Sequence, residues 1–223
     1  MVNRQRFNGL VRILNDRNMD AVFLAPSSDL KYVTGLDLKS DSRLKGAVIT
    51  REGSSFFLCP SLYMENIRAI SGAMPIVEWT DEDGFKGAFR SGLDQAGLRG
   101  PMTMAFTRGI EAGDMIDVTD GLDVECVNGF FLLSPMRSVK SVDELAKMRH
   151  ASHMNDRMME ALVGYLRPGL RERDIRRFVM DFHESQGGKP RVPGVATGVN
   201  SASPHYGGDN DRTHSRANSF EDS

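Results

Sequence analysis

The chain has 223 residues, of which 40% are hydrophobic and 26% are charged, so its composition is that of a globular protein and not of a disordered chain. Its 28 basic and 30 acidic residues leave a net charge of −2, which argues against nucleic-acid binding because such proteins need a basic surface. The sequence holds no apolar run near the ~18 residues of a membrane helix and no signal-peptide stretch at its start, so we expect a cytoplasmic protein with no membrane partner.

Residues 4–134 alternate between the patterns of helices and strands. Helical segments show apolar residues at spacings of three and four, and strands show short apolar runs closed by turn residues. Alternating strands and helices predict an α/β fold, and a hairpin turn at 51–54 makes its sheet mixed rather than purely parallel. The expected helices are 7–14, 62–70, 85–96 and 110–118, and the expected strands are 21–24, 46–50, 55–59, 75–79, 103–106 and 124–127.

Residues 141–188 are expected to form two helices. Ser141 and Glu144 have the spacing of a capping box, in which two side chains satisfy backbone N–H groups at a helix start. Pro168 and Gly169 separate the two helices. Each helix carries an apolar stripe, which we interpret as core packing, with a partner-binding helix as the alternative. The stripes are Leu145, Met148, Met159, Leu162 and Leu166 in the first helix, and Ile175, Phe178, Val179 and Phe182 in the second.

Residues 189–223 differ in character from the rest of the chain. Val199 is the last aliphatic residue of any size, and from Gly207 onward nearly every residue is Gly, Asp, Asn, Arg, Ser or Thr. Such a stretch cannot bury enough apolar area to offset its ordering entropy, so we expect a disordered tail over 207–223.

Few residues carry a chemical signal by themselves. His150 and His153 share a helix face and could hold a metal, but no third ligand is near, so a solvated face is the favoured interpretation. Cys59 and Cys126 lie in apolar segments and are interpreted as buried or idle thiols. His205 is more informative, because small residues and a proline present its ring on a tight loop where it could donate a hydrogen bond to a developing oxyanion. An ordinary loop histidine is the alternative.

Four short segments carry a family resemblance. They follow one another along the chain as Tyr32–Gly35 (Y-V-T-G), Met136–Arg149 with its R-x-x-K-S-x-x-E-L core, Pro168–Glu172 (P-G-x-x-E) and Ala196–Tyr206 (A-T-G-V-N-S-A-S-P-H-Y). In order and spacing they resemble the creatinase, prolidase and aminopeptidase P family of "pita-bread" metallopeptidases.

The resemblance implies a fold and an activity. It implies a creatinase-type N-terminal domain over 4–134, with a mixed sheet flanked by helices, and the first helices of an incomplete pita-bread α+β catalytic domain over 135–206. Members of the family hydrolyse the bond before proline, in a peptide with proline at the second position, or a C–N bond in a small substrate. Two divalent metals, often manganese or cobalt, are held by two Asp, one His and two Glu. His205 matches the family's histidine that contacts the substrate and stabilises the tetrahedral intermediate, and it is not a metal ligand.

The segment after Tyr206 departs from the family pattern. The resemblance places the first metal-binding Asp on an apolar strand in D-x-G context, and no such strand occurs in 207–223. Asp209 and Asp211 precede the position of that strand, so we transfer no metal role to them. We therefore expect no metal and no peptidase activity for this chain, as in a shortened member of the family with an out-of-frame tail. With the helices' apolar faces uncovered, a homodimer or aggregation is expected.

Two other functions stay open. In the family the N-terminal domain packs against the catalytic site of a partner subunit, so residues 4–134 could act as a non-catalytic dimerisation or substrate-gating module. An unrelated nucleotide-binding α/β domain is the weaker alternative, because no G-x-G-x-x-G motif follows the strand at 21–24 or at 55–59. A metal titration discriminates between enzyme and module, because tight binding of two ions supports the enzyme.

Overall fold

The structure, a computed structural model, describes residues 3–70 and 74–207, so the tail expected over 207–223 lies outside them from residue 208 onward. The chain divides into two compact units between Val139 and Lys140. Within the described ranges, no helix is both long enough and apolar enough to cross a bilayer.

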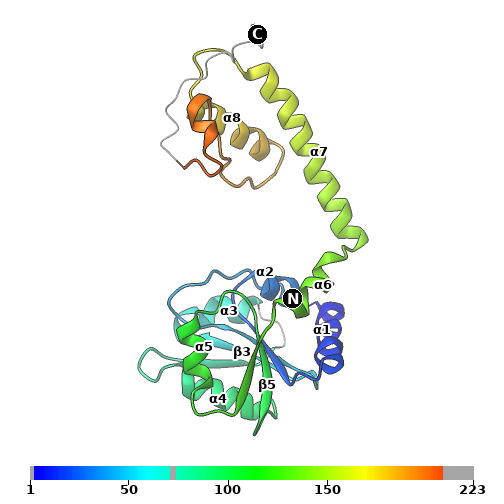
Figure 1. Cartoon of the computed structure of the whole chain (residues 1–223), viewed down its shortest axis with the longest axis vertical. Helices are drawn as coiled ribbons and strands as arrows, with labels where there is room; N and C mark the ends of the chain where they lie inside the picture. The colour runs from blue at the N-terminus through cyan, green and yellow to red at the C-terminus, as the bar shows by residue number, and fades with distance from the viewer. Residues whose placement is uncertain (1–2, 71–73, 208–223) are drawn as a thin grey trace. The chain divides into compact units, whose positions relative to one another are not determined.

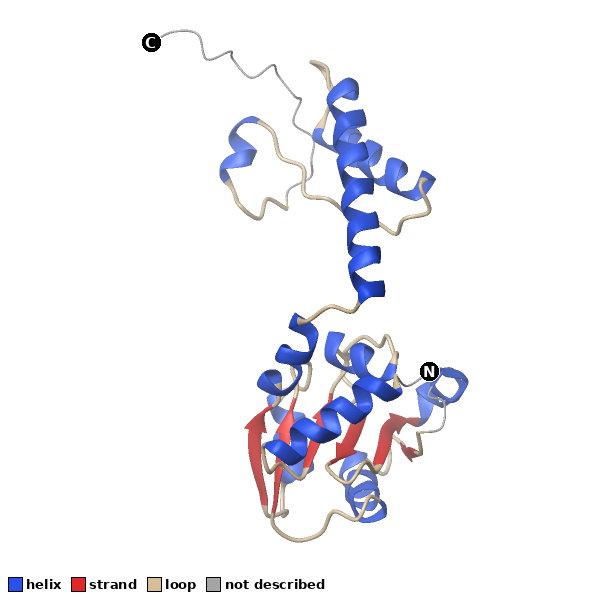
Figure 2. Cartoon of the chain, turned by 90° about the vertical axis from the view of Figure 1, so that its right-hand side faces the viewer, coloured by secondary structure: helices blue, strands red, loops and turns tan. Residues whose placement is uncertain are grey.

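The first unit is built on a six-stranded mixed sheet with the strand order β4-β3-β2-β1-β5-β6 (Figures 1 and 2). β1 pairs antiparallel with β2, and β2 with β3, whereas β1–β5, β3–β4 and β5–β6 are parallel pairs. The predicted mixed sheet is therefore confirmed, and all six predicted strands are present. They are β1 (Ala21–Leu24), β2 (Gly46–Thr50), β3 (Ser55–Pro60), β4 (Ile76–Trp79), β5 (Met102–Phe106) and β6 (Val124–Asn128).

Helices cover both faces of this sheet (Figure 2). Because successive strand residues point to opposite faces, β1 contributes to two separate cores. Val22 and Leu24 pack in the core with α1, α2, α3 and α6, whereas Ala21 and Phe23 pack in the core with α4 and α5. The helical segments are α1 (Arg4–Asp16), α2 (Ser28–Thr34), the 3-10 turn η1 (Ser61–Tyr63), α3 (Met64–Ile70), α4 (Phe85–Gln95), α5 (Ala112–Thr119) and α6 (Phe130–Ser138).

Helix α2 is a correction, because no helix is predicted between the strands at 21–24 and 46–50. The Ser27 hydroxyl caps this helix by accepting hydrogen bonds from the backbone N–H groups of Asp29 and Leu30. Leu30 and Val33 are fully buried against the sheet. A helix of seven residues is too short to show a clear period in sequence, and its tertiary packing stabilises it.

Helix α6 is the second correction. Pro135 lies inside it and argues against a helix at the sequence level, because proline lacks the N–H that a helix interior needs. Burial of Leu132 and Leu133 against the sheet outweighs that loss. The domain boundary predicted at residue 134 falls inside α6, and the compact unit runs on to Val139.

The second unit contains the long helix α7 (Val142–Tyr165), helix α8 (Glu172–Ser185) and the 3-10 turn η2 (Gly198–Ala202) (Figure 1). The predicted capping box at the start of α7 is confirmed. The Ser141 side chain accepts from the Glu144 N–H at 3.2 Å, and the Glu144 carboxylate accepts from the Ser141 N–H at 2.8 Å. The rings of Tyr165 and Phe178 stack with centroids 4.3 Å apart, which fixes α8 against the end of α7.

The core-packing interpretation of the α7 stripe is wrong for the structure described. Leu145, Met148 and Met159 are 38%, 54% and 48% exposed. The buried residues of α7 are Met154 and Met158, which line one groove together with Val179 and His183 of α8. In α8 the interpretation holds for Ile175 and Val179, which are buried. Which stripe of a long helix is buried depends on where its neighbour packs, and the spacing of apolar residues does not contain that information.

Candidate functional site

The first two segments of the family resemblance lie in contact in the first unit. The Tyr32 hydroxyl donates to the Met136 carbonyl oxygen at 3.1 Å, across 104 residues of sequence. One residue further on, Arg137 donates to the buried carboxylate of Asp29 at 2.7 Å. The Arg6 guanidinium lies 3.9 Å from the centre of the Tyr32 ring and donates to the Tyr32 carbonyl oxygen. Tyr32 therefore ties α1 and α2 to α6.

The Thr-Gly half of the first segment ends helix α2. The Thr34 hydroxyl donates to the Leu30 carbonyl oxygen at 2.7 Å and accepts from the Leu36 N–H at 3.1 Å. Gly35 follows with φ of 79°, a left-handed conformation that favours glycine. This segment is thus structural, and its side chains hold the helices of the first unit together.

Removing the Tyr32 hydroxyl tests that role. We expect Tyr32→Phe to lower the free energy of unfolding of the first unit by about 1 kcal/mol, because the hydrogen bond to Met136 is lost while the ring stays under Arg6. Urea unfolding followed by Trp79 fluorescence measures this, because Trp79 is the chain's single tryptophan and lies buried in the first unit. Tyr32→Leu removes the ring as well and is expected to cost more. Equal stability of Tyr32→Phe and the unmodified protein contradicts the role of the hydroxyl.

The last two segments of the resemblance also lie in contact, in the second unit. Glu172, the first residue of α8, is fully buried. Its Oε1 atom accepts from the Thr197 N–H at 2.6 Å, from the Thr197 hydroxyl at 3.1 Å and from the Asn200 side-chain amide at 3.0 Å. Its Oε2 atom accepts from the same amide at 3.2 Å. In the sequence, Glu172 stands out only as a motif position. The Thr-x-x-Asn pair at 197–200, which can meet a carboxylate at a helix start, is the signal for its partners.

His205 lies in a turn that follows η2, and its side chain is exposed. Tyr206, beside it, is half-buried. The Tyr206 N–H donates to the Ser203 carbonyl oxygen at 3.3 Å, which closes the turn that carries the histidine. The ring is thus presented to solvent on a tight loop, as the small residues around it predict.

His150 faces a groove of about 480 Å³ in the second unit. His183, Lys189 and Arg191 also line this groove, and Met154 lies among its apolar residues. His153, which the sequence pairs with His150, instead lies 3.8 Å from the Asp156 carboxylate on the exposed side of α7. The two histidines, although three residues apart on one helix, therefore do not form a common metal-binding site.

The residues described do not fit a two-metal centre. Within 3–70 and 74–207, no three His, Cys, Asp or Glu side chains lie close enough together to hold a metal ion. The Glu172 carboxylate is engaged by the loop that leads to His205: its Oε1 atom accepts from Thr197 and Asn200, and its Oε2 atom accepts from Asn200. We therefore derive no catalytic step through a metal from these residues.

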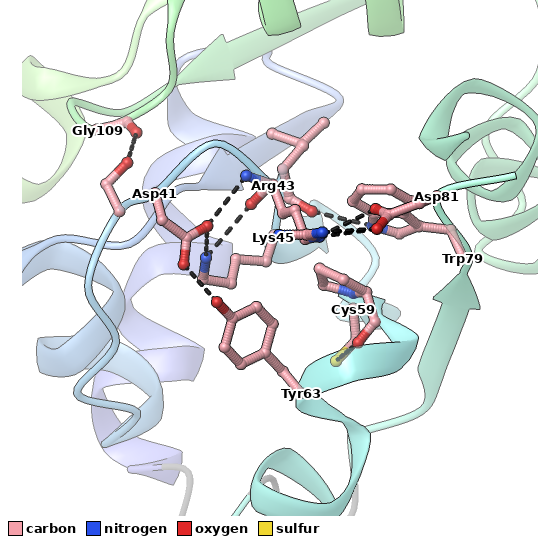
Figure 3. Close-up of polar contacts among 11 residues, drawn as sticks. Asp41, Arg43, Lys45, Cys59, Tyr63, Trp79, Asp81 and Gly109 are labelled. Carbon is pink, nitrogen blue, oxygen red and sulfur yellow. Dashed lines mark hydrogen bonds and ion pairs between the residues drawn. The ribbon is translucent and has the colours of Figure 1, made fainter.

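A cluster of charged side chains marks the first unit (Figure 3). We name it the Asp41 cluster, and it consists of Asp41, Arg43, Lys45, Tyr63 and Asp81. Asp41 accepts from Lys45 Nζ at 2.6 Å and from the Tyr63 hydroxyl at 2.7 Å. The Arg43 guanidinium donates to both oxygens of Asp81, with its closest contact at 2.6 Å. The cluster joins the loop before β2 to η1 and to the end of β4.

The charge of Asp41 is stabilised within this cluster. Burial acts to raise its pKa, but the hydrogen bonds from Lys45, from Tyr63 and from the Arg43 N–H outweigh burial and lower the pKa to about 2. Lys45 is 2% exposed, so its ammonium depends on this partner. Sequence patterns do not predict this cluster. Its local signal is a lysine placed directly before the buried strand at 46–50.

The two cysteines are unpaired and differ in environment. Cys59 is buried, and burial together with the nearby Glu78 raises the pKa of its thiol to about 11. It therefore stays protonated and behaves as a small hydrophobic residue. Cys126 is exposed on β6, which excludes the buried option for this residue and leaves the idle one.

Comparison with known proteins gives the same order of domains along the chain. Residues 6–114 match the Creatinase/Prolidase N-terminal domain, and residues 146–220 match Metallopeptidase family M24. An uncharacterized peptidase of Staphylococcus aureus is 23% identical over 171 residues, which are 76% of this chain and 47% of that protein. The chain thus spans about half the length of the curated relatives it matches.

Solved structures also resemble this chain. A dipeptidase from Pyrococcus horikoshii has a TM-score of 0.80 and 25% identity, with 94% of this chain and 58% of that chain covered. A prolidase from Thermococcus sibiricus has a TM-score of 0.83 and 19% identity, with 96% of this chain and 59% of that chain covered, and shows the same fold. With both domain matches in sequence order and these folds alongside them, the chain belongs to the creatinase/prolidase (M24) family.

Proposed function

We propose that this chain carries the N-terminal domain and the beginning of the catalytic domain of a peptidase that hydrolyses the bond before proline. The observation that carries the proposal is the likeness to the Pyrococcus horikoshii dipeptidase over 94% of this chain. The resemblance of the four sequence segments to prolidases and aminopeptidases P supports substrates with proline at the second position. In the whole protein, two divalent metals such as manganese or cobalt would activate the attacking water.

His205 is the residue of this chain for which we propose a catalytic role. An exposed imidazole on a loop closed by its own hydrogen bonds can donate an N–H to the oxygen that gains charge when water attacks a carbonyl. Such a donor stabilises the tetrahedral intermediate more than the substrate, which is the condition for catalysis. The resemblance of Ala196–Tyr206 to the family's loop supports this role for His205.

We further propose that residues 1–223 by themselves bind no metal pair and hydrolyse no peptide. This proposal rests on the ligand set of two Asp, one His and two Glu, which the residues described do not assemble. A tightly bound metal needs several protein ligands held in fixed geometry.

Metal titration with an activity assay tests these two proposals. Calorimetry with Mn²⁺ and Co²⁺ on the purified chain is expected to give no tight stoichiometric binding, and Xaa-Pro dipeptides with Mn²⁺ present are expected to remain intact. Cleavage of such a dipeptide, abolished by His205→Ala, would overturn the proposed inactivity and support the role of His205. Cleavage that His205→Ala leaves unchanged would contradict both proposals.

The second candidate function is a non-catalytic module for dimerisation or for limiting access of substrate. The first unit favours it, because two cores on the two faces of its sheet are both closed within residues 3–139 of the described structure. A stable dimer in analytical ultracentrifugation, formed without metal, supports the module, and a monomer at all concentrations contradicts it.

We also propose a cytoplasmic location for this protein, because cysteines without a disulfide partner, such as Cys59, suit a reducing compartment.

A further inference from the structure

The turn that leads to His205 is tied to helix α8 through one buried carboxylate. Glu172 has no exposed surface, so its charge needs donors inside the protein. Thr197 and Asn200 supply them, and the contact with the Thr197 N–H, at 2.6 Å, has the short distance of a hydrogen bond to a charged acceptor. Bonds of this kind contribute more than neutral ones.

The two residues that donate to Glu172 define one turn of the backbone. Thr197 is the residue that precedes η2, and Asn200 lies within it. The Asn200 N–H also donates to the Thr197 carbonyl oxygen at 3.1 Å, so the carboxylate holds a turn that is already closed on itself. The Ser203 N–H donates to the Asn200 carbonyl oxygen at 3.1 Å and carries the same chain of contacts toward His205.

Helix α8, which carries Glu172, is itself held in place by its packing. Glu172 begins α8, and Ile175 and Val179 of that helix are buried. The stacked rings of Tyr165 and Phe178 hold α8 against α7. A side chain at the first position of a helix so anchored has little freedom to move, so a turn bound to it is held in one place.

We propose that Glu172 is a positioning residue that sets the place of the loop carrying His205. The carboxylate does not touch the substrate in this proposal. It acts by holding Thr197 and Asn200, and through them the turn in which His205 lies. The consequence for catalysis rests on the proposed function of His205, whereas the positioning itself depends only on the contacts of Glu172.

The test replaces a hydrogen-bond acceptor at position 172 by a donor. Glu172→Gln keeps the shape of the side chain but places an NH₂ group opposite the NH₂ group of Asn200, so two donors face each other. We expect hydrogen exchange at the Thr197 amide, measured by NMR on the full chain, to become roughly tenfold to hundredfold faster. The imidazole signals of His205 are expected to shift and those of His153, on the exposed side of α7, to stay in place.

The double variant Glu172→Gln/Asn200→Asp restores a donor opposite an acceptor. It is expected to return the Thr197 exchange rate to within a few-fold of the unmodified protein and to restore the His205 signals. Glu184→Gln is the matched control, because Glu184 is an exposed glutamate of the same helix and its replacement is expected to change neither readout. If Glu172→Gln does not fold, Asn200→Ala takes its place, since it removes the amide donor and keeps both Thr197 contacts.

Two results would overturn the proposal. One is Thr197 exchange and His205 signals in Glu172→Gln, or His205 signals in Asn200→Ala, that match the unmodified protein. The other is a double variant that behaves no better than the single one. Because neither readout needs metal or substrate, failure here is distinct from failure of the proposed peptidase function, which the dipeptide assay measures.

Discussion

Asp41→Asn is expected to lower the free energy of unfolding of the first unit by about 2–3 kcal/mol. The substitution keeps the shape of the side chain but removes the charge that faces Lys45, whose ammonium is almost fully buried. Removing one partner of such a pair leaves an uncompensated charge away from water, which costs more than the pair itself contributes. Urea unfolding followed by Trp79 fluorescence measures the loss, because Trp79 donates to the Leu44 carbonyl oxygen beside the cluster.

Asp37→Asn is the matched control, because it makes the same change in the same loop at an exposed ion pair. Asp37 lies 2.6 Å from Lys31, and both side chains are more than half exposed. Exposed pairs of this kind contribute little, so we expect a change within about 0.5 kcal/mol. If Asp41→Asn and Asp37→Asn lower the free energy of unfolding equally, the burial of Lys45 is not the cause of the destabilisation.

The same variant predicts a pH dependence. The pKa of Asp41 is lowered to about 2 from 3.8, so its contribution to stability is fully present above about pH 4 and is lost as the pH falls toward 2. The gap in urea midpoint between the unmodified protein and Asp41→Asn is therefore expected to be constant from pH 7 to 5 and to narrow below pH 4. A gap of the same size at pH 5 and pH 2.5 contradicts this.

Gly46→Ala is expected to destabilise the first unit by about 3 kcal/mol. A Cβ atom at this position would lie 2.6 Å from the Leu24 carbonyl oxygen and 2.6 Å from the Phe23 ring. Both contacts come from β1, which pairs with β2 on one side and β5 on the other and so cannot move away. Overpacking of this kind is relieved only by shifting the backbone of central strands.

Gly113→Ala provides the control of opposite sign. Gly113 lies in α5, and a Cβ atom there would meet nothing within 4 Å. Alanine in a helix loses less backbone entropy on folding than glycine, so a gain of about 0.5–1 kcal/mol is expected. Thermal and urea unfolding of the two variants, compared with the unmodified protein, measure both effects. Equal responses at the two glycines would mean that the close approach at Gly46 is not limiting.

Most strands of the sheet can be predicted from the local amino-acid sequence. Strands such as β1 and β3 are short apolar runs ended by turn residues, and such runs identify a strand without knowledge of its neighbours. The capping box at Ser141 and Glu144 likewise involves residues only three apart, so the sequence contains the whole of it. The family resemblance also follows from sequence, because the order and spacing of its four segments are linear properties.

The contacts between those segments depend on the tertiary structure. Tyr32 reaches Met136 and Glu172 reaches Asn200 only because helices distant in sequence pack together. Helix α6 forms despite Pro135 for the same reason, since the sheet buries its leucines. The Asp41 cluster joins residues up to 40 positions apart, from Asp41 to Asp81, and forms where the loop before β2 meets η1 and the end of β4. Local sequence sets what each segment prefers, whereas burial and charge pairing between distant segments decide which groups meet.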